Sequence, residues 1–186
     1  MEWNRKPVFG VGINDIPEYT KGTKVYLVWK SMLARCYSPY TRRTNPAYEG
    51  CSVCEEWLTL SIFRKWFEEN YREGCQLDKD ILVPGNKEYS PSTCCFVPQE
   101  INKLFKGHSR KSGITTGVRK QNRKYIAQFR EDGITHKASF DSLSEAEDFY
   151  RSHKRNRLID IAERYFKAEK LSEKTYKAIK NYAVCL

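Results

Sequence analysis

The chain has 186 residues, of which 40% are apolar and 13% aromatic, so it can bury the core of one domain or of two small ones. No segment has the apolar length that a membrane-spanning helix needs, and the N-terminus lacks the apolar run of a signal peptide. We therefore expect a protein that does not enter a membrane and acts in the cytoplasm. Seven cysteines, an odd number, argue against a complete disulfide framework there.

The net charge of +10 is confined to the second part of the chain. Residues 1–100 contain 13 Lys/Arg and 13 Asp/Glu, whereas residues 101–186 contain 20 and 10. Within that part, residues 101–130 hold nine basic side chains and no acidic one. A run of one sign is typical of a surface that binds a polyanion, since a surface needed only for solubility mixes both signs. This pattern predicts binding of DNA or RNA.

Two helices and a loop are predicted in the first part. Residues 23–37 and 55–71 carry apolar side chains at three- and four-residue steps, which is the helical period. The second of these stripes consists of Trp57, Leu60, Phe63 and Phe67. Residues 38–50 are rich in Pro, Thr, Asn and Gly, so we predict a loop between the helices.

The middle of the chain predicts a strand, a turn, a second strand and a short helix. The apolar run Asp80–Val83 is followed by a Pro-Gly-Asn turn signal, and residues 93–98 form a second β-like run. Residues 99–107 then have a helical pattern that ends at a glycine. Two aspartates flank Lys79 at the start of this region, and their repulsion requires either that Lys79 lies between them or that a cation joins them.

The last part predicts a linker, a sheet and two helices. Residues 107–117 are polar and glycine-rich, as in a linker, and residues 116–142 predict three short antiparallel strands. A helix over 142–166 begins with Ser142 or Ser144 as its cap, and Ser172 caps a last helix.

Alternation along the predicted middle strand separates two faces. Tyr125, Ala127 and Phe129 lie on one face, which we expect to pack on the helix, while the other face carries cations and an amide. Arginine can bond guanine with two hydrogen bonds and glutamine can bond adenine in the same way. We predict DNA contacts from Arg119, Lys120, Arg123, Lys124, Gln128 and Arg130. A basic sheet without a ligand is the alternative.

Several stretches together resemble a family of phage and mobile-element homing endonucleases of the HNH, or ββα-metal, type that carry an AP2-type DNA-binding domain. The stretches are "WKSMLARCY", "YEGCSVCEEW", "FRKWFEENY", "LDKDILVPGNKEYSPSTCCFVPQEIN" and "TGVRKQNRKYIAQF". The resemblance implies an α+β fold, with an HNH-like ββα core and flanking helices in residues 1–106. It implies an AP2-like three-stranded antiparallel sheet with helices in residues 107–186.

The resemblance also implies a catalytic site, with two departures. Asp78 falls on a metal ligand and Asn86 on the Asn of the turn, so Asp78, Lys79, Asp80 and Asn86 are the candidate catalytic residues, with Asp78 and Asp80 holding Mg²⁺. Lys79 stands where the family has its general-base histidine, and Cys94 stands where the last ligand is expected. A thiol is a poor ligand for a hard cation. A vestigial site on a retained fold is the alternative.

Cys51 and Cys54 have the spacing of a structural zinc site, which Cys94 and Cys95 could complete, but the weak spacing and the adjacent pair favour buried apolar thiols without a metal. Three hypotheses for function remain. The first is a phage-type hydrolase that nicks or cleaves duplex DNA with a divalent metal. The second is a catalytically inactive DNA-binding regulator. The third is a phage protein that binds and inhibits a host protein.

Overall fold

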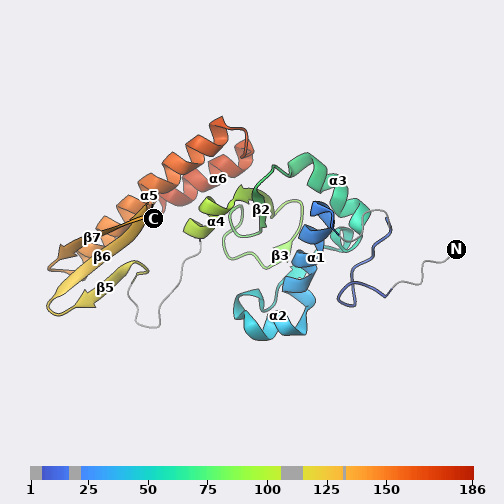
Figure 1. Ribbon diagram of the computed structural model, residues 1–186, viewed down its shortest axis with the longest axis horizontal. Coiled ribbons are helices and arrows are strands. Elements are labelled where there is room, and N and C mark those ends of the chain that lie inside the picture. The colour runs from blue at the N-terminus through green and yellow to red at the C-terminus, as the bar shows by residue number, and fades with distance from the viewer. Residues whose placement is uncertain (1–5, 17–21, 106–114, 132) are drawn as a thin grey trace. The chain divides into compact units, whose positions relative to one another are not determined.

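The computed structural model describes residues 6–16, 22–105, 115–131 and 133–186. Its helices and short sheets place the chain in the α+β class, as predicted. The chain divides into two compact units, Met1–Val97 and Pro98–Leu186 (Figure 1). The sequence placed the domain boundary after residue 106. The structure assigns the helix before that point to the second unit, where it packs against a long helix.

The first unit is built from helices and very short strands. Its elements are α1 (Lys24–Tyr37), α2 (Pro39–Thr44), the 3-10 helices η2 (Pro46–Tyr48) and η3 (Glu55–Leu58), α3 (Leu60–Asn70), β1 (Ser52–Val53), β2 (Cys75–Asp78), β3 (Glu88–Tyr89) and β4 (Cys95–Pro98). The core contains the buried stripe of α1 and the predicted aromatic stripe. Trp29 and Trp57 are fully buried, and the Trp29 Nε1–H donates to the carbonyl of Trp57 over 2.7 Å. This bond joins α1 to η3.

The helix and the loop predicted over residues 38–71 need correction. The expected helix over 55–71 is divided, because Thr59 is extended and bridges Ile13. Ile13 donates to the carbonyl of Leu58 and accepts from the N–H of Leu60, so it takes backbone groups that a continuous helix would use. The expected loop over 38–50 contains α2, in which the Ser38 hydroxyl caps the helix and proline occupies its first turn.

The strands of the middle region pair in a different way from the predicted hairpin. β2 lies beside β4, while β3 pairs in parallel with β1, so the segment between β2 and β4 takes part in a second small sheet. The predicted strand over Asp80–Val83 is wrong: the strand ends at Asp78, and the following residues form bends that bury Ile81. The predicted Pro-Gly-Asn turn is confirmed, since residues 84 and 85 form a turn that the Asn86 N–H closes on the carbonyl of Val83 over 3.1 Å.

The second unit is a sheet covered by helices. Its elements are α4 (Gln99–Phe105), β5 (Val118–Gln121), β6 (Lys124–Glu131), β7 (Ile134–Phe140), α5 (Leu143–Lys167) and α6 (Glu173–Val184). The strands are antiparallel in the order β5-β6-β7, which confirms the predicted sheet. Ser142 caps α5 in a full capping box, and Ser172 caps α6, as predicted.

The sheet packs one face on α5. Val118, Ala127 and Ala146 are buried there, with Tyr125 and Tyr150 packed against them. This confirms the predicted inward face of β6. Gly117 has φ +92°, and a Cβ on it would lie 2.0 Å from the Tyr150 ring, so only glycine fits at the entry to β5.

The α-helical part of this unit is a hairpin with a third helix attached. α6 runs along α5 (Figure 1). α4 is held to α5 by Glu100, which accepts hydrogen bonds from Arg164 at 2.5 Å and from the Tyr165 hydroxyl at 3.2 Å. Most of the linker expected over 107–117 lies outside the described residues. In the described part of the chain, no helix has the length and apolar character needed to cross a membrane.

Candidate nucleic-acid interface

The face of the sheet turned away from α5 carries charge of one sign. Residues opposite one another in neighbouring antiparallel strands point to the same face. The pairs Arg119–Ile126, Gln121–Lys124, Ile126–Ser139, Gln128–Lys137 and Arg130–Thr135 therefore define this face, which we call the outer face. Its four cations are exposed, and no acidic residue is among the strand residues that form it.

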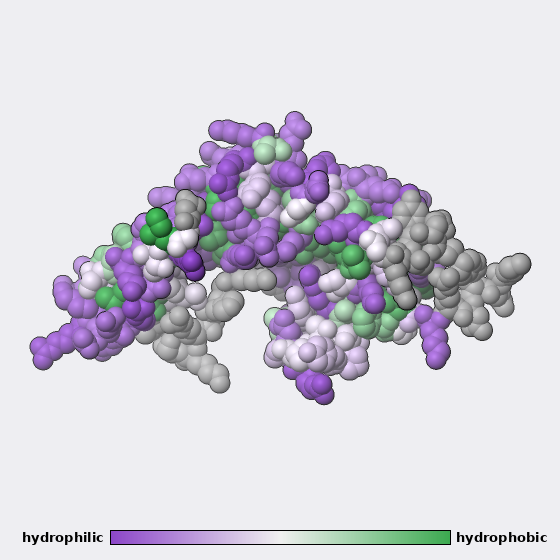
Figure 2. Space-filling view, viewed as in Figure 1, coloured by the Kyte–Doolittle hydropathy of each residue, from purple (hydrophilic) through white to green (hydrophobic). Residues whose placement is uncertain are grey.

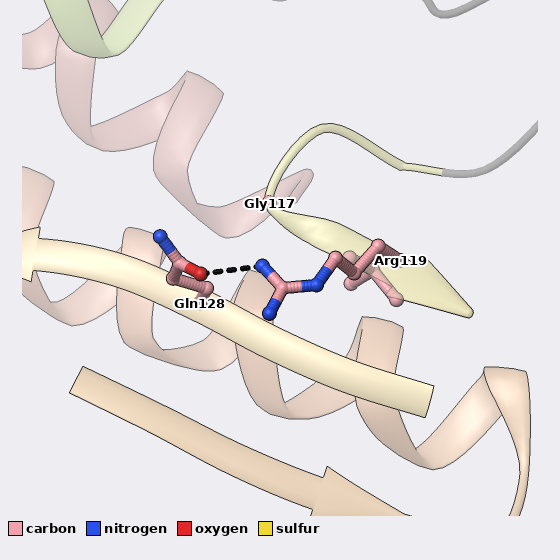
Figure 3. A pocket seen from close by; sticks show the side chains of 4 residues that line it. Gly117, Arg119 and Gln128 are labelled. Carbon is pink, nitrogen blue, oxygen red and sulfur yellow. Dashed lines mark hydrogen bonds between the residues drawn. The ribbon is translucent and has the colours of Figure 1, made fainter. Parts of the chain in front are cut away.

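Arg119 lies between two glutamines on the outer face. Its guanidinium donates to Gln128 Oε1 over 2.6 Å (Figure 3). It also donates to Gln121 Oε1 over 3.2 Å. Because a guanidinium only donates, the two amide oxygens face it and the amide NH₂ groups are left for other partners. The Arg119 guanidinium and the NH₂ groups of the two glutamines thus form a row of hydrogen-bond donors across β5 and β6.

Two other cations of the outer face contact groups of the second unit. Lys124 forms an ion pair of 2.6 Å with Asp141, but both side chains are more than half exposed. Arg130 donates from Nε to the carbonyl of Gly133 over 3.3 Å. Such exposed contacts are weak and can be exchanged for contacts with a ligand.

The structure separates the six residues predicted to contact DNA. Arg119, Lys124, Gln128 and Arg130 lie together on the outer face. Lys120 pairs with Tyr125 and so points to the opposite face, with its ammonium 5.9 Å from the Tyr125 ring centroid.

Arg123 lies in the turn between β5 and β6, beside Asn122 at φ +55°, and is exposed at the end of the sheet. Sequence reasoning missed Lys137, Gln121, Thr135 and Ser139. Lys137 lies beyond the basic run of residues 101–130, and only the register of β7 against β6 places it on the outer face.

The second unit is hydrophilic over most of the surface seen in Figure 2, with hydrophobic side chains in small separate patches. Its exposed large apolar residues include Ile134, Phe149 and Phe166, which come from three separate places in the sequence. Interfaces with proteins are rich in aromatic and aliphatic residues at their centre. The outer face, with its cations and amides, has the composition of a surface for a polyanion.

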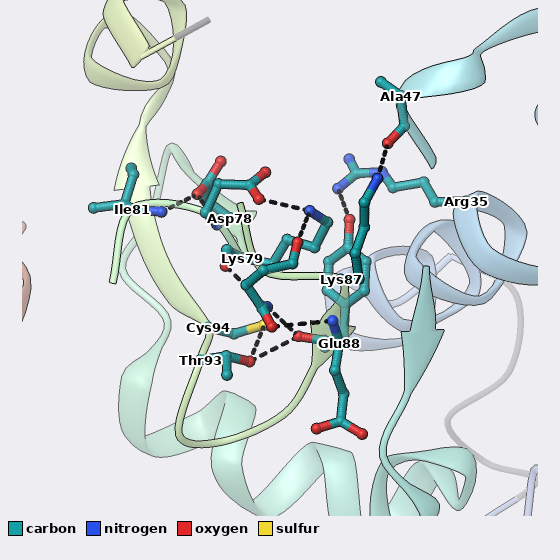
Figure 4. A network of polar contacts seen from close by, with 12 residues as sticks. Arg35, Ala47, Asp78, Lys79, Ile81, Lys87, Glu88, Thr93 and Cys94 are labelled. Atoms are coloured by element: carbon teal, nitrogen blue, oxygen red, sulfur yellow. Dashed lines mark hydrogen bonds and ion pairs between the residues drawn. The ribbon is translucent and has the colours of Figure 1, made fainter. Parts of the chain in front are cut away.

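The candidate catalytic residues of the first unit form a closed network around Lys79 (Figure 4). Lys79 is only 5% exposed. Its ammonium donates to Asp80 Oδ1 over 2.6 Å and to the carbonyl of Asn86 over 2.6 Å. The Asn86 amide in turn donates to the carbonyl of Lys79 over 3.1 Å and to that of Glu88 over 2.5 Å. These bonds tie the two ends of the turn together.

Asp78 ends β2 and shapes the turn. Its Oδ1 accepts from the backbone N–H groups of Asp80 at 2.8 Å and of Ile81 at 2.9 Å. This is the local hydrogen bonding by which aspartate stabilises a turn. Burial raises the pKa of the Asp78 carboxyl above its ordinary value, against the opposing effect of the two backbone bonds. A carboxylate that is hard to ionise is a weak cation ligand.

The four residues do not fit a Mg²⁺ site in this arrangement. The Lys79 ammonium is bonded to Oδ1 of Asp80, so a positive charge already lies beside that carboxylate, and Oδ1 of Asp78 accepts two backbone bonds. Burial raises the pKa of the Cys94 thiol to about 12, so the residue at the implied last ligand is neutral. Within the described residues, no three His, Cys, Asp or Glu side chains form a group that could hold a metal.

The cysteines and histidines of the chain do not complete either implied site in the described part of the molecule. Cys51 is buried, and burial raises the pKa of the Cys54 thiol to about 11. His136 and His153 belong to β7 and α5 of the second unit, and His108 lies outside the described residues.

The comparisons with known proteins return no relative: no family model, no curated protein and no solved structure matches the chain. The resemblance to HNH endonucleases with an AP2-type domain therefore stays a prediction.

Proposed function

We propose that this protein binds duplex DNA through the outer face of β5, β6 and β7. The observation that carries the proposal is the set of four exposed cations on that face, together with two glutamines and no carboxylate among the strand residues that point to it. Lysines and arginines that neutralise phosphates supply most of the affinity of a protein for DNA.

The polar side chains of the outer face support contacts with bases as well as phosphates. The major groove admits a ribbon of β-strands, and its base edges present acceptors to arginine and both donors and acceptors to glutamine. Arg119 is held by two amide oxygens, so its geometry is defined before DNA arrives. We propose that Arg119 and Gln128, at the centre of the face, contact bases, and that Lys124, Arg130 and Lys137 contact phosphates.

We propose further that the network around Lys79 serves the fold and not DNA cleavage. Its ammonium is buried and bonded on both sides, so it reaches no substrate without breaking the turn. Of the three hypotheses drawn from the sequence, this favours the DNA-binding regulator over the metal-dependent nuclease. The composition of the outer face favours DNA over a host protein as the partner.

The wider setting is also a proposal. An HNH-like scaffold that has lost its chemistry, joined to an AP2-like sheet, is consistent with the order β2, β4, α4 and then β5 to α5 along the chain. A phage-encoded regulator acting in the cytoplasm of a host cell would meet duplex DNA there.

The experiment measures binding and cleavage on the same full-length protein. A fluorescently labelled duplex of random sequence is titrated at several salt concentrations, and a supercoiled plasmid is incubated with protein and Mg²⁺ or Mn²⁺. We expect binding that weakens steeply with salt and a plasmid that stays supercoiled. Absence of binding at low salt would overturn the assignment of the outer face. Nicking that disappears in Asp78→Ala would restore the nuclease hypothesis.

A further inference from the structure

The second unit contains a cavity of about 330 Å³ beside the start of β5. It is lined from four elements or their approaches, including Leu104 of α4, Gly117 before β5, Phe129 of β6 and His153 of α5. The volume lies within the range of about 300–1,000 Å³ that is typical of small-molecule sites. The Gln128 N–H donates to the carbonyl of Gly117 over 2.7 Å, which is the last bond between β6 and the segment that leads into β5. The cavity lies where β6 continues past this bond.

The charged groups that line the cavity are all basic. Arg130, Lys154 and Arg157 line it, and no acidic side chain is among its described lining residues. Arg157 is partly compensated from outside, since Glu100 and Glu131 lie 3.9 and 3.8 Å from its guanidinium. These two carboxylates therefore position the Arg157 guanidinium and offset part of its charge.

Lys154 has no such compensation. Burial lowers the pKa of its ammonium, with no carboxylate offsetting the effect, and its nearest charge-stabilising contact is the Tyr182 ring at 6.0 Å. A half-buried ammonium without an anion is unfavourable unless a ligand supplies one. His153 adds a buried Nε2 that has no hydrogen-bond partner among the described residues, with Glu131 Oε2 3.9 Å away from it.

The remaining walls are aromatic. The Phe129 ring stacks on the His153 imidazole with centroids 3.4 Å apart, and the Tyr150 ring packs beneath Gly117. Flat rings and cations together suit a ligand that has a planar ring and a negative group.

We propose that this cavity binds a nucleotide-like anion, with its phosphate on Lys154 and Arg157 and its planar base against the aromatic wall. The inference is independent of the proposed function, because it rests on side chains of α5 and on the inner side of β6. The ligand chemistry has two sources, a free mononucleotide or the terminal nucleotide of a DNA strand.

The probes are adenosine 5′-monophosphate, adenosine, ribose 5-phosphate and inorganic phosphate, titrated into the full-length protein by calorimetry at low salt. We expect one site for the monophosphate, with adenosine and ribose 5-phosphate each at least about tenfold weaker, because each lacks one of the two recognised groups. Binding of the monophosphate that is no tighter than that of adenosine or of ribose 5-phosphate would overturn the proposal, as would no binding at all.

Two variants on one helix test the position of the site. Lys154→Gln removes the uncompensated charge and should weaken binding of the monophosphate at least about tenfold. Lys167→Gln removes an exposed charge outside the cavity and should leave binding unchanged. Without ligand, Lys154→Gln should melt no lower than the parent, since an unpaired half-buried charge is lost. Equal affinity of parent and Lys154→Gln would overturn the site.

A last pair of measurements separates the sources and the two functional assignments. A 5′-phosphorylated trinucleotide that displaces the monophosphate identifies a strand end as a ligand, whereas failure to displace identifies a free nucleotide. Arg119→Ala, which alters the outer face, should keep full affinity for the monophosphate. DNA binding that fails in the parent, with intact monophosphate binding, would remove the proposed function and leave the cavity site standing.

Discussion

Lys79 and Arg119 are both positively charged residues that hydrogen bond to side chains from their own unit, yet the structure uses them in opposite ways. Lys79 is buried and its ammonium is enclosed by Asp80 and by the carbonyl of Asn86. Arg119 is exposed, and its partners are neutral amides that leave its charge uncompensated. The difference teaches that the partner of a basic residue, more than its presence in a motif, decides whether it can bind a ligand.

The same contrast holds for the neighbourhoods of the two residues. Around Lys79, each donor and acceptor closes a turn, so removal of one group leaves others buried and unpaired. On the outer face, the cations repel one another and are stabilised only by solvent and by weak exposed contacts. Substitutions should therefore damage stability in the first region and DNA affinity in the second.

The largest expected effect is on DNA affinity. Arg119→Ala combined with Arg130→Ala removes two cations of the outer face, which should weaken binding to duplex DNA at least about tenfold at low salt. Because only Arg130 of the two is proposed to contact a phosphate, the slope of log K against log salt should also fall by about 0.9. Fluorescence anisotropy across a salt series measures both quantities.

The matched control for this variant is Lys174→Ala combined with Lys177→Ala. These lysines are exposed on α6, so the change in net charge is the same but the outer face is intact. We expect a much smaller change in affinity and slope. Equal losses in the two variants would mean that total charge, not the outer face, drives binding.

The second effect is on the stability of the first unit. Lys79→Ala leaves the carbonyl of Asn86 and the Asp80 carboxylate without their shared donor, and it should lower the free energy of unfolding by about 1–3 kcal/mol. All four tryptophans lie within residues 1–97, so tryptophan fluorescence during urea unfolding reports this unit alone. DNA affinity should be unchanged wherever the variant is folded.

Lys65→Ala is the control for Lys79→Ala, because Lys65 is exposed on α3 and should affect stability by less than about 0.5 kcal/mol. A Lys79→Ala protein as stable as this control would show that the turn does not depend on the ammonium. Loss of DNA affinity in folded Lys79→Ala would break the contrast between the regions and place Lys79 at a binding site.

The third effect is a pH dependence of smaller size. Burial raises the folded-state pKa of Asp78 above its unfolded value, so the folded state binds the proton more tightly and stability falls as pH rises from near 3.8 through the raised pKa. Asp78→Asn keeps an oxygen acceptor but does not titrate, so it should gain stability relative to the parent as pH rises through that window. Urea unfolding at a series of pH values measures the difference.

Glu69→Gln, an exposed substitution on α3, serves as the control and should change little relative to the parent across the same pH range. A difference between Asp78→Asn and the parent that does not vary with pH would show that the Asp78 carboxyl does not titrate differently in the folded state.

Local signals in the sequence were sufficient for much of the second unit. The three strands, the inward face of β6 and the caps Ser142 and Ser172 follow from alternation and from hydroxyl residues before a helix. The outer face was found only in part, because Lys137 enters it through the register of β7, which no single strand reveals.

The first unit was harder to predict because distant contacts decide its local structure. Ile13 divides the helix expected over 55–71 by bridging Thr59. The residues next to Thr59 carry no signal for this break, because its partner is distant in the sequence. The strand expected over Asp80–Val83 fails because the Asp78 side chain bonds the next backbone groups. From the sequence, the repulsion between Asp78 and Asp80 required either that Lys79 lies between them or that a cation joins them. In the structure the Lys79 ammonium bonds to Asp80.

The smallest expected effect is that of a metal chelator. A structural zinc held by Cys51 and Cys54 would have to displace protons from buried thiols, and burial raises the pKa of Cys54 to about 11 and that of the nearby Cys94 to about 12. We expect protein purified without added metal to contain less than about a tenth of an equivalent of zinc, and its melting temperature to be unchanged by a chelator, because zinc would otherwise contribute to folding. Elemental analysis and thermal melts test this.

One equivalent of zinc, with a melting temperature that falls on chelation, would contradict the assignment of these cysteines as buried apolar thiols. The double variant Cys51→Ser and Cys54→Ser should then lose the metal, while Cys185→Ser, at an exposed cysteine near the C-terminus, should keep it. The first unit would then be stabilised by a metal in addition to the network around Lys79, and it would differ further from the outer face of the second unit. Zinc lost from neither variant would direct the search to the other cysteines of the first unit, Cys36, Cys75, Cys94 and Cys95.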